Sequence, residues 1–356
     1  MKRLIASLII CLACIQVYAY DPAVQTNVRP KPKEITPNAG PRIAHGADVF
    51  VTAQFIWWKV FQEGLNYALT GIRANPGTTL SGTGTEHTPD FGWEPGFKVG
   101  LGVNLPHDGW DIYAQYTWIQ SHHNDDRATS ADANMQEGFL LGALTTSANL
   151  IRNITEARTH WDLNFNVLDL EFGRNFYVSE FLTLRPFGGL KFTWQDQDWD
   201  SSFTAEEVGV DNIQPGTSGF VRSKQDHDTW GVGIRTGLNG SWFFTKNWSL
   251  FANTALSAMW TDYDIDRKDS FHPNSVSNGT TALNVHRDEH SIRAVTEFQL
   301  GLKGEWWFSN DDYHLAVSAA YEQQVWINYG SYIFVINDAD NDLSFHGLTV
   351  KARFDF

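Results

Sequence analysis

The sequence lacks the features that define several protein classes. Only two of its 356 residues are cysteines, Cys11 and Cys14, so the chain beyond them has no disulfide and no thiolate chemistry. No apolar run reaches the about 20 residues that a membrane-spanning helix needs, and the mean hydropathy is −0.32. Lys and Arg number 26 against 41 Asp and Glu, a net charge of −15, which argues against a nucleic-acid partner.

Aromatic residues, in contrast, are abundant. They make up 14% of the chain and include 15 Trp, too many for a disordered protein. Proteins that cross a water–lipid boundary use such amphipathic rings at both interfaces. The Trp content therefore favours a membrane location without membrane-spanning helices.

The N-terminus has the pattern of an export signal. Lys2 and Arg3 precede an apolar run over residues 4–15, and Ala19 stands where a signal peptidase would cut. We predict a signal peptide over residues 1–19, with a buried N-terminal helix as the alternative. The proline-containing residues 20–47 are interpreted as an extended lead-in and residues 48–356 as the folded domain. Without Lys2 and Arg3 the exported chain has a net charge of −17.

Alternation of apolar and polar residues runs through the folded domain and predicts β-strands. Residues 97–105 and 110–118 alternate and are joined by the turn-forming residues 106–109, which indicates a hairpin. Similar segments, with residues 48–60, give ten strands. Residues 65–69 and 139–144 allow up to twelve. The apolar parity changes between Val167 and Leu168, which predicts a β-bulge there and an inward-facing Asp162.

The connections between these strands alternate in length. Short ones at residues 106–109, 174–181, 245–247 and 309–312 separate long polar ones at about 120–159, 195–228, 261–292 and 328–342. A soluble β-sandwich would also show alternating strands. Short turns at one end and long loops at the other are instead typical of an antiparallel outer-membrane β-barrel with short periplasmic turns and long external loops.

Tryptophan spacing supports the barrel. Trp pairs on one strand face lie 8 to 12 residues apart, which at the rise and tilt of barrel strands spans roughly 19–28 Å and brackets an apolar band of about 25 Å. The predicted girdle contains Trp110, Trp118, Trp194, Trp230, Trp242, Trp248, Trp260 and Trp306. The last strand ends on Phe356, which we interpret as a signal for the barrel-assembly machinery, an ordinary edge strand being the alternative.

Four segments resemble the pore-forming major outer membrane proteins of Legionella and Chlamydia-like bacteria. They are FIWWKVFQEGLNYAL from Phe55, GFKVGLGVNLPHDGWDIYAQYTW from Gly96, WDLNFNVLDLEFGRNFYVSEFLTLRPFGGLK from Trp161, and HGLTVKARFDF at the end. The resemblance implies a porin of the bacterial outer membrane. It carries over no solute and no binding residue. The cysteine-crosslinked envelopes of the chlamydial members are not expected here, because the exported chain lacks cysteine.

The polar strand faces define candidate pore-lining residues. These are Lys98, Asp111, Arg185, Lys191, Arg235, Glu297, Lys303, Glu305, Lys351 and Arg353. Charges of both signs suit a hydrated channel, although a barrel closed by its own salt bridges has the same composition. Because inward glycines such as Gly100, Gly102 and Gly237 would free space, we favour a narrow pore for ions and small solutes.

Most of the negative charge falls in the predicted long loops, which hold 22 acidic and 8 basic residues. A field of that sign would enrich cations at the external mouth, so we expect a cation preference that weakens with salt. Two Asp-x-Asp-x-Asp motifs lie just beyond the Trp rim and are candidates for divalent cations, with solvated acids as the alternative. Their residues are Asp196, Asp198, Asp200, Asp262, Asp264 and Asp266.

Other functions have less support. No spacing of Ser, His and Asp specifies catalysis, so neither enzymatic activity nor a cofactor is expected. The second hypothesis is an adhesin or structural surface protein, in which the loops bind and the barrel is an anchor. The expected partners are outer-membrane lipid, the assembly machinery, small ions and solutes, and further copies in a homo-oligomer.

Overall fold

The protein was analysed as a computed structural model that describes residues 48–71, 73–74, 80–81, 83–105, 108–129, 136–137, 150–209, 217–275, 279–309, 312–333 and 340–356. The predicted signal peptide and lead-in lie outside these residues. Regular structure in the described residues consists of strands. None of the described segments forms a helix long and apolar enough to cross a membrane.

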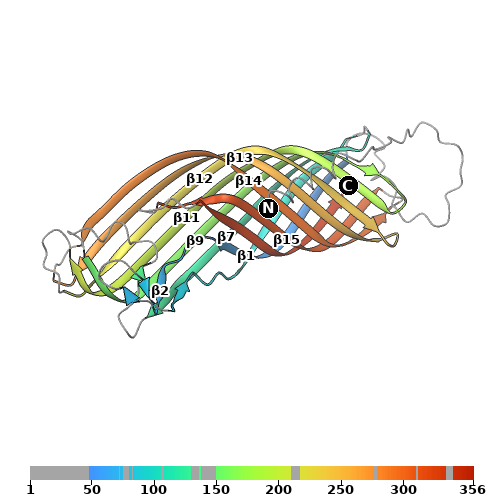
Figure 1. Cartoon of the computed structure of the whole chain (residues 1–356). Coiled ribbons are helices and arrows are strands. Elements are labelled where there is room, and N and C mark those ends of the chain that lie inside the picture. Colours follow the sequence, from blue (N-terminus) through green and yellow to red (C-terminus); the bar gives the residue numbers. More distant parts are fainter. Residues whose placement is uncertain are drawn as a thin grey trace, which may run out of the picture. The chain divides into compact units, whose positions relative to one another are not determined.

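Ten strands form a closed antiparallel barrel (Figure 1). Their order is β1, β6, β7, β9, β11, β12, β13, β14, β15 and β16, and pairing of β16 with β1 closes the barrel. The bounds are β1 (Asp48–Gln62), β6 (Trp93–Asn104), β7 (Trp110–Thr129), β9 (Leu150–Arg174), β11 (Leu182–Gly209), β12 (Gly219–Phe243), β13 (Trp248–Pro273), β14 (Thr280–Phe308), β15 (Tyr313–Ser331) and β16 (Asp340–Asp355). The predicted all-β barrel is confirmed at the lower end of the expected strand range.

The remaining strands are short. β10 (Phe176–Tyr177) pairs with the start of β11. The others form two small sheets, from β2 (Ala68–Thr70), β5 (Thr85–His87) and β8 (Gln136–Glu137), and from β3 (Arg73–Ala74) and β4 (Leu80–Ser81). The possible pairing at residues 65–69 is thus real but lies outside the barrel wall, and residues 139–144 lie outside the described residues.

The two ends of the barrel differ, as the connection lengths predict. Short turns join β6 to β7, β12 to β13 and β14 to β15. At this same end β1 begins and β16 ends, and Val49 N donates to Phe356 O over 3.3 Å. At the other end, strands extend well into the predicted long loops. β11 and β12 leave only residues 210–218 between them, and β13 and β14 leave residues 274–279. The predicted loop segments continue as strands because their side chains still alternate between the inside and the outside of the barrel. Only the outward residues change, from apolar to acidic.

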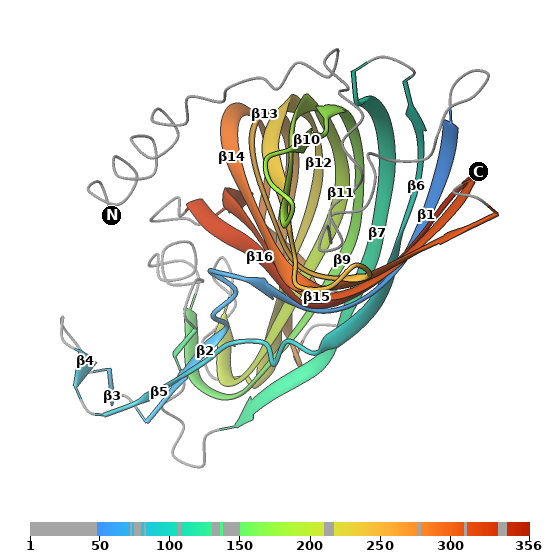
Figure 2. The same cartoon turned by 90° about the vertical axis from the view of Figure 1, so that its right-hand side faces the viewer.

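Alternate residues face opposite sides of the wall, and Figure 2 shows β1, β6 and β7 side by side in it. The outward side chains between the Trp positions are apolar and exposed, among them Phe55, Leu101 and Ile234. All eight predicted girdle tryptophans face outward, but Trp110, Trp118 and Trp306 are partly covered by neighbouring rings such as Phe172 and Phe97. Phe356 is half exposed at the short-turn rim.

The predicted bulge at residues 167–168 is wrong. Val167 pairs with Thr193 and Leu168 with Phe192 in unbroken register. The apolar parity changes because β9 buries Trp161, Phe165 and Val167 inside the barrel at the loop end and turns Leu168 and its alternates outward at the turn end. Asp162 consequently faces outward, where it lies 2.6 Å from His122 Nδ1 and 2.8 Å from His160 Nε2.

Candidate functional site in the barrel lumen

Inward-facing charges from several strands lie close together in the lumen, in a set that we call the charged belt. It consists of Lys98, Asp111, Asp169, Glu171, Arg185, Lys191, Arg235, Glu297 and Glu322. Lys98 Nζ lies 2.5 Å from Glu322, and Lys191 Nζ lies 2.9 Å from Asp169 and 3.0 Å from Glu297. Six of the predicted pore-lining residues are thus brought together.

Arginines connect the belt across non-adjacent strands. Arg185 on β11 binds Asp111 on β7 and, over 2.8 Å, Glu171 on β9. Arg235 on β12 binds Glu171 and, over 2.9 Å, Glu297 on β14. Most of these side chains are nearly inaccessible, and Lys191 is 1% exposed. Removing one member of such a pair leaves a buried uncompensated charge, which typically costs about 3–5 kcal/mol.

Sequence reasoning missed three acids of the belt: Asp169, Glu171 and Glu322. Asp169 and Glu171 alternate with the outward Leu168, Leu170 and Phe172, but neither was among the predicted lining residues. The unbroken alternation from Trp161 places both inward. Glu322 lies on the polar face of β15 between the outward Tyr321 and Gln323, so the same alternation also predicts its position.

The other four predicted pore-lining residues, Lys303, Glu305, Lys351 and Arg353, lie outside the belt. Lys303 pairs with Glu305 over 3.0 Å, and Arg353 pairs with Asp355 over 2.6 Å. Lys351 forms no ion pair among the described residues. A cavity of about 190 Å³ is bounded by all four and by His314. A second cavity of about 140 Å³, here called the central cavity, lies against the belt and shares Arg185, Lys351 and Arg353 with the first.

The loop-end half of the interior is filled by apolar side chains, which we call the aromatic plug. Its large members are Trp58, Trp161, Phe165, Trp199, Trp326, Tyr329, Tyr332 and Phe345, all fully buried or within 1% of it. The Phe165 ring on β9 lies 5.3 Å from Trp326 on β15, five strands away around the ten-stranded barrel. Side chains therefore meet across the full diameter. The four Trp of the plug were not predicted to face inward.

The chain at the end of β15 folds into this plug. In residues 329–333, the inward segment, Tyr332 Oη donates to Gln197 over 2.6 Å and accepts from Trp161 Nε1 over 3.3 Å. Ile333 N donates to Gln225 over 3.0 Å, and Ile333 O accepts from Arg267 over 2.6 Å. These partners come from β9, β11, β12 and β13. The segment therefore crosses the lumen and contacts strands that do not pair with β15.

The inward glycines do not leave open space. A Cβ on Gly102 would overlap the ring of Phe50, one on Gly100 would overlap Tyr113, and one on Gly237 would overlap Phe187. These rings occupy the volume that the glycines provide, and Phe50 and Tyr113 stack at 5.6 Å. The expectation that inward glycines widen the lumen is therefore wrong at these three positions.

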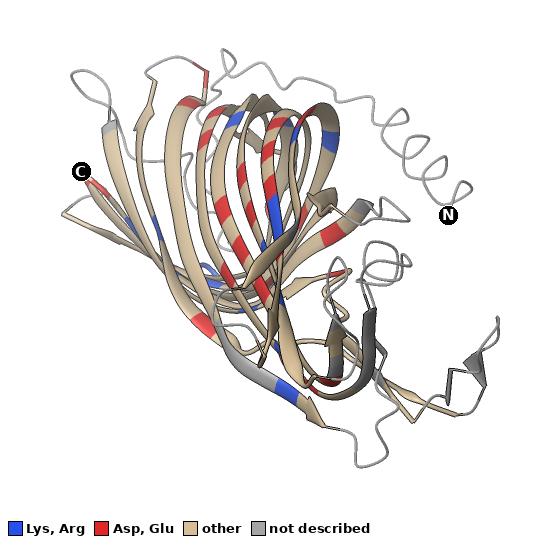
Figure 3. Ribbon diagram, turned by 90° about the vertical axis from the view of Figure 1, so that its left-hand side faces the viewer, with Lys and Arg blue, Asp and Glu red and all other residues tan. Residues whose placement is uncertain are grey.

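The two acidic motifs lie on the outer wall, on the loop-end side of Trp194 and Trp230. Figure 3 shows the acids of this region as red bands on neighbouring strands. In register they form rows over four strands: Asp196, Asp228, Asp264 and Asp288 in one, and Asp198, Asp226, Asp266 and His286 in the next. The pKa of Asp228 is raised by burial and by its acidic neighbours. Directly opposed like charges in a sheet are destabilising.

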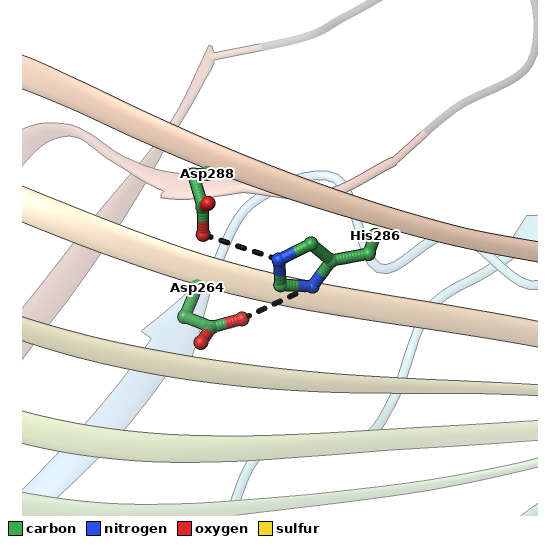
Figure 4. A group of neighbouring side chains, drawn as sticks. All are labelled: Asp264, His286 and Asp288. Carbon is green, nitrogen blue, oxygen red and sulfur yellow. Dashed lines mark ion pairs between the residues drawn. The ribbon is translucent and has the colours of Figure 1, made fainter.

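Within these rows, Asp264, His286 and Asp288 form a compact group (Figure 4). His286 Nδ1 lies 3.4 Å from Asp264 and Nε2 lies 3.3 Å from Asp288. A hydrogen bond to Asp266, with the nearby Asp288 charge, raises the pKa of His286. All three side chains are exposed, and a protonated His286 would offset part of the negative charge of its acidic neighbours. A divalent cation at Asp196, Asp198, Asp200, Asp262, Asp264 and Asp266 stays a prediction.

Comparison with known proteins identifies the family. The model of the Legionella pneumophila major outer membrane protein precursor matches residues 41–356. The chain belongs to this outer-membrane protein family. The short-turn end of this family member is therefore assigned to the periplasm and the loop end to the exterior. No curated protein matches the chain.

Solved structures show more distant likenesses to this outer-membrane protein. The outer membrane protease OmpT from Escherichia coli has a TM-score of 0.31 and 11% identity, covering 87% of this chain and 95% of its own. A Pseudomonas aeruginosa FadL homologue has a TM-score of 0.29 and 9% identity, and the match covers 91% of this chain and 95% of the homologue. Ail from Yersinia pestis has a TM-score of 0.21 and 9% identity, and the match covers 87% of this chain and 98% of Ail. Scores this low do not bear on the function of the present family member.

Proposed function

We propose that the protein is a narrow diffusion channel for ions and small hydrophilic solutes, not an enzyme. The proposal rests on one observation: the periplasmic half of the lumen is lined by charged side chains around cavities of about 140 and 190 Å³. Charged lumen residues tune the selectivity of membrane barrels, whereas a barrel that serves only as an anchor can fill its interior with apolar side chains.

The aromatic plug is then the barrier to conduction. Trp161, Trp199 and Tyr332 meet across the lumen, with ring centroids of Trp199 and Tyr332 5.3 Å apart. Gly330 and Ser331 of the inward segment pair with β16, whereas Tyr332 and Ile333 contact the facing strands through a few hydrogen bonds that involve side chains. We propose that displacement of the inward segment opens the channel and that conductance is intermittent.

A cation preference is part of the proposal. It rests on the acidic rows of the outer wall, because the belt itself carries nearly balanced charge. Exposed charges are screened beyond about 10 Å at 0.1 M salt. We therefore expect the reversal potential across a planar bilayer to indicate cation preference at low salt and to decline at 1 M salt. Anion preference at low salt would contradict this part.

A second function, an adhesin or structural surface protein, is favoured by the plug itself. A barrel filled across its diameter can serve as an anchor, and external segments would then bind. Single-channel recording of the refolded protein separates the two functions. Discrete openings are expected for a channel; no conductance, in the unaltered chain or in a variant with a truncated plug, would refute the channel and support the anchor.

A further inference from the structure

Lys351 differs from the cations of the charged belt because it forms no ion pair with the residues that the structure describes. Lys98, Lys191, Arg185 and Arg235 each contact at least one acid within 3.0 Å. No acid lies within 4.0 Å of Lys351 among the residues that the structure describes, and its ammonium donates no hydrogen bond to them. Its Nζ lies 5.5 Å from the ring of Tyr113. An ammonium in an enclosed space without a counter-ion is electrostatically incomplete.

The acids around Lys351 are all engaged by other cations. The central cavity is lined by five cationic side chains and three carboxylates. Each carboxylate is already used: Glu171 by two arginines, Glu297 by Arg235 and Lys191, and Glu322 by Lys98. Arg353, the nearest cation in sequence, is paired within its own strand to Asp355. The other four cations that line the cavity are each paired with an acid, so Lys351 is the one lining cation that forms no ion pair with the described residues.

The cavity also offers neutral hydrogen-bond donors. The Asn239 side chain lines it and donates no side-chain hydrogen bond within the described part of the chain. The volume of about 140 Å³ is close to that of a cavity known to hold benzene, about 150 Å³. A polar space of this size accommodates a small anion with one or two waters.

We propose that the central cavity binds a small anion, of the size of phosphate or a short carboxylate, at Lys351. Arg353 and Asn239 complete the set of donors around it. Access is from the periplasmic side, because the second cavity shares Lys351, Arg353 and Asn239 and extends to His314 near the short turns. The site lies on the inner wall and requires no opening of the aromatic plug, so it does not depend on conductance.

The test is isothermal titration calorimetry of the refolded full chain in detergent with inorganic phosphate. The buffer is chloride-free and of constant ionic strength, with gluconate as the bulky counter-anion. One phosphate per chain is expected to bind. Lys351→Gln should weaken binding at least about tenfold, because one charge-assisted hydrogen bond is lost. Lys351→Arg should retain it.

Two further variants make the result decisive. Lys268→Gln removes the same charge from an exposed position on β13 and should bind phosphate as the unaltered chain does. Asn239→Ala removes an uncharged donor and should weaken binding less than Lys351→Gln, which keeps the test valid if that variant does not fold. No binding by the unaltered chain, unchanged binding by Lys351→Gln, or equal weakening by Lys268→Gln would overturn the proposal. Because the assay involves no membrane, its outcome is independent of channel activity.

Discussion

Replacing Tyr332 tests whether the inward segment is the barrier. Tyr332→Phe retains the ring but removes the hydroxyl that donates to Gln197 over 2.6 Å and accepts from Trp161 over 3.3 Å. Each hydrogen bond contributes about 0.5–1.5 kcal/mol, so the closed state should lose about 1–3 kcal/mol. Since 1.4 kcal/mol corresponds to a tenfold change in an equilibrium, the open fraction of a rarely open channel should rise about 5- to 140-fold.

The assay is the open probability in single-channel recordings at fixed voltage. Tyr321→Phe on β15, the strand that leads into the inward segment, is the matched control, because Tyr321 faces outward and is 53% exposed; it should leave the open probability unchanged. Tyr332→Ala, which also empties the ring volume, should raise open probability further. If both Tyr332 variants conduct as the unaltered chain does, the inward segment is not the barrier and the reasoning fails.

Three other perturbations have definite expected outcomes. Arg235→Gln leaves Glu171 and Glu297 without one of their cations, and the free energy of unfolding in denaturant should fall by about 3–5 kcal/mol; a loss below 1 kcal/mol would mean that the belt is hydrated and weakly coupled. Gly102→Ala forces Phe50 to move, so unfolding should become easier by about 1–3 kcal/mol, whereas an unchanged midpoint would show that the ring has room. The pKa of Asp228 is raised in the folded state, so its ionised carboxylate destabilises the fold. This destabilisation is fully present above the folded-state pKa and disappears as the pH falls towards the pKa of the unfolded chain. Asp228→Asn should consequently raise the thermal midpoint at neutral pH and low salt, with no gain at 1 M salt or in acid; a lower midpoint at neutral pH would contradict the repulsion.

The barrel itself could be predicted from the sequence because its signals are local. A dyad repeat, alternating connection lengths and Trp at fixed intervals each follow from crossing a bilayer with strands, and each is read along the chain without knowledge of which strands pair. Six of the predicted lining residues lie in the charged belt. Their inward orientation could be predicted because the alternation along a strand alone decides which face a residue occupies.

What could not be predicted depends on contacts between distant strands. The approach of Phe165 to Trp326 depends on barrel diameter and stagger, which no single strand encodes. Nor does local alternation show whether an inward glycine leaves a void or accommodates a ring, as Gly102 does for Phe50. The supposed bulge arose because two functions, an apolar membrane face and an apolar plug, occupy opposite faces of the same strand at different heights.

The outer face of the barrel carries rows of exposed acids, whereas the lumen holds Lys351, which forms no ion pair with the described residues, and this difference bears on selectivity. The acids of the outer wall, such as Asp196 and Asp264, are exposed to solvent, so salt screens their effect on an approaching ion. Lys351 acts inside a cavity of about 140 Å³, where few mobile ions enter to screen it. Entry and passage thus favour ions of different sign, and their balance should shift towards anions as salt rises. A selectivity at 1 M salt that does not respond to Lys351→Gln would place the controlling charge elsewhere in the lumen.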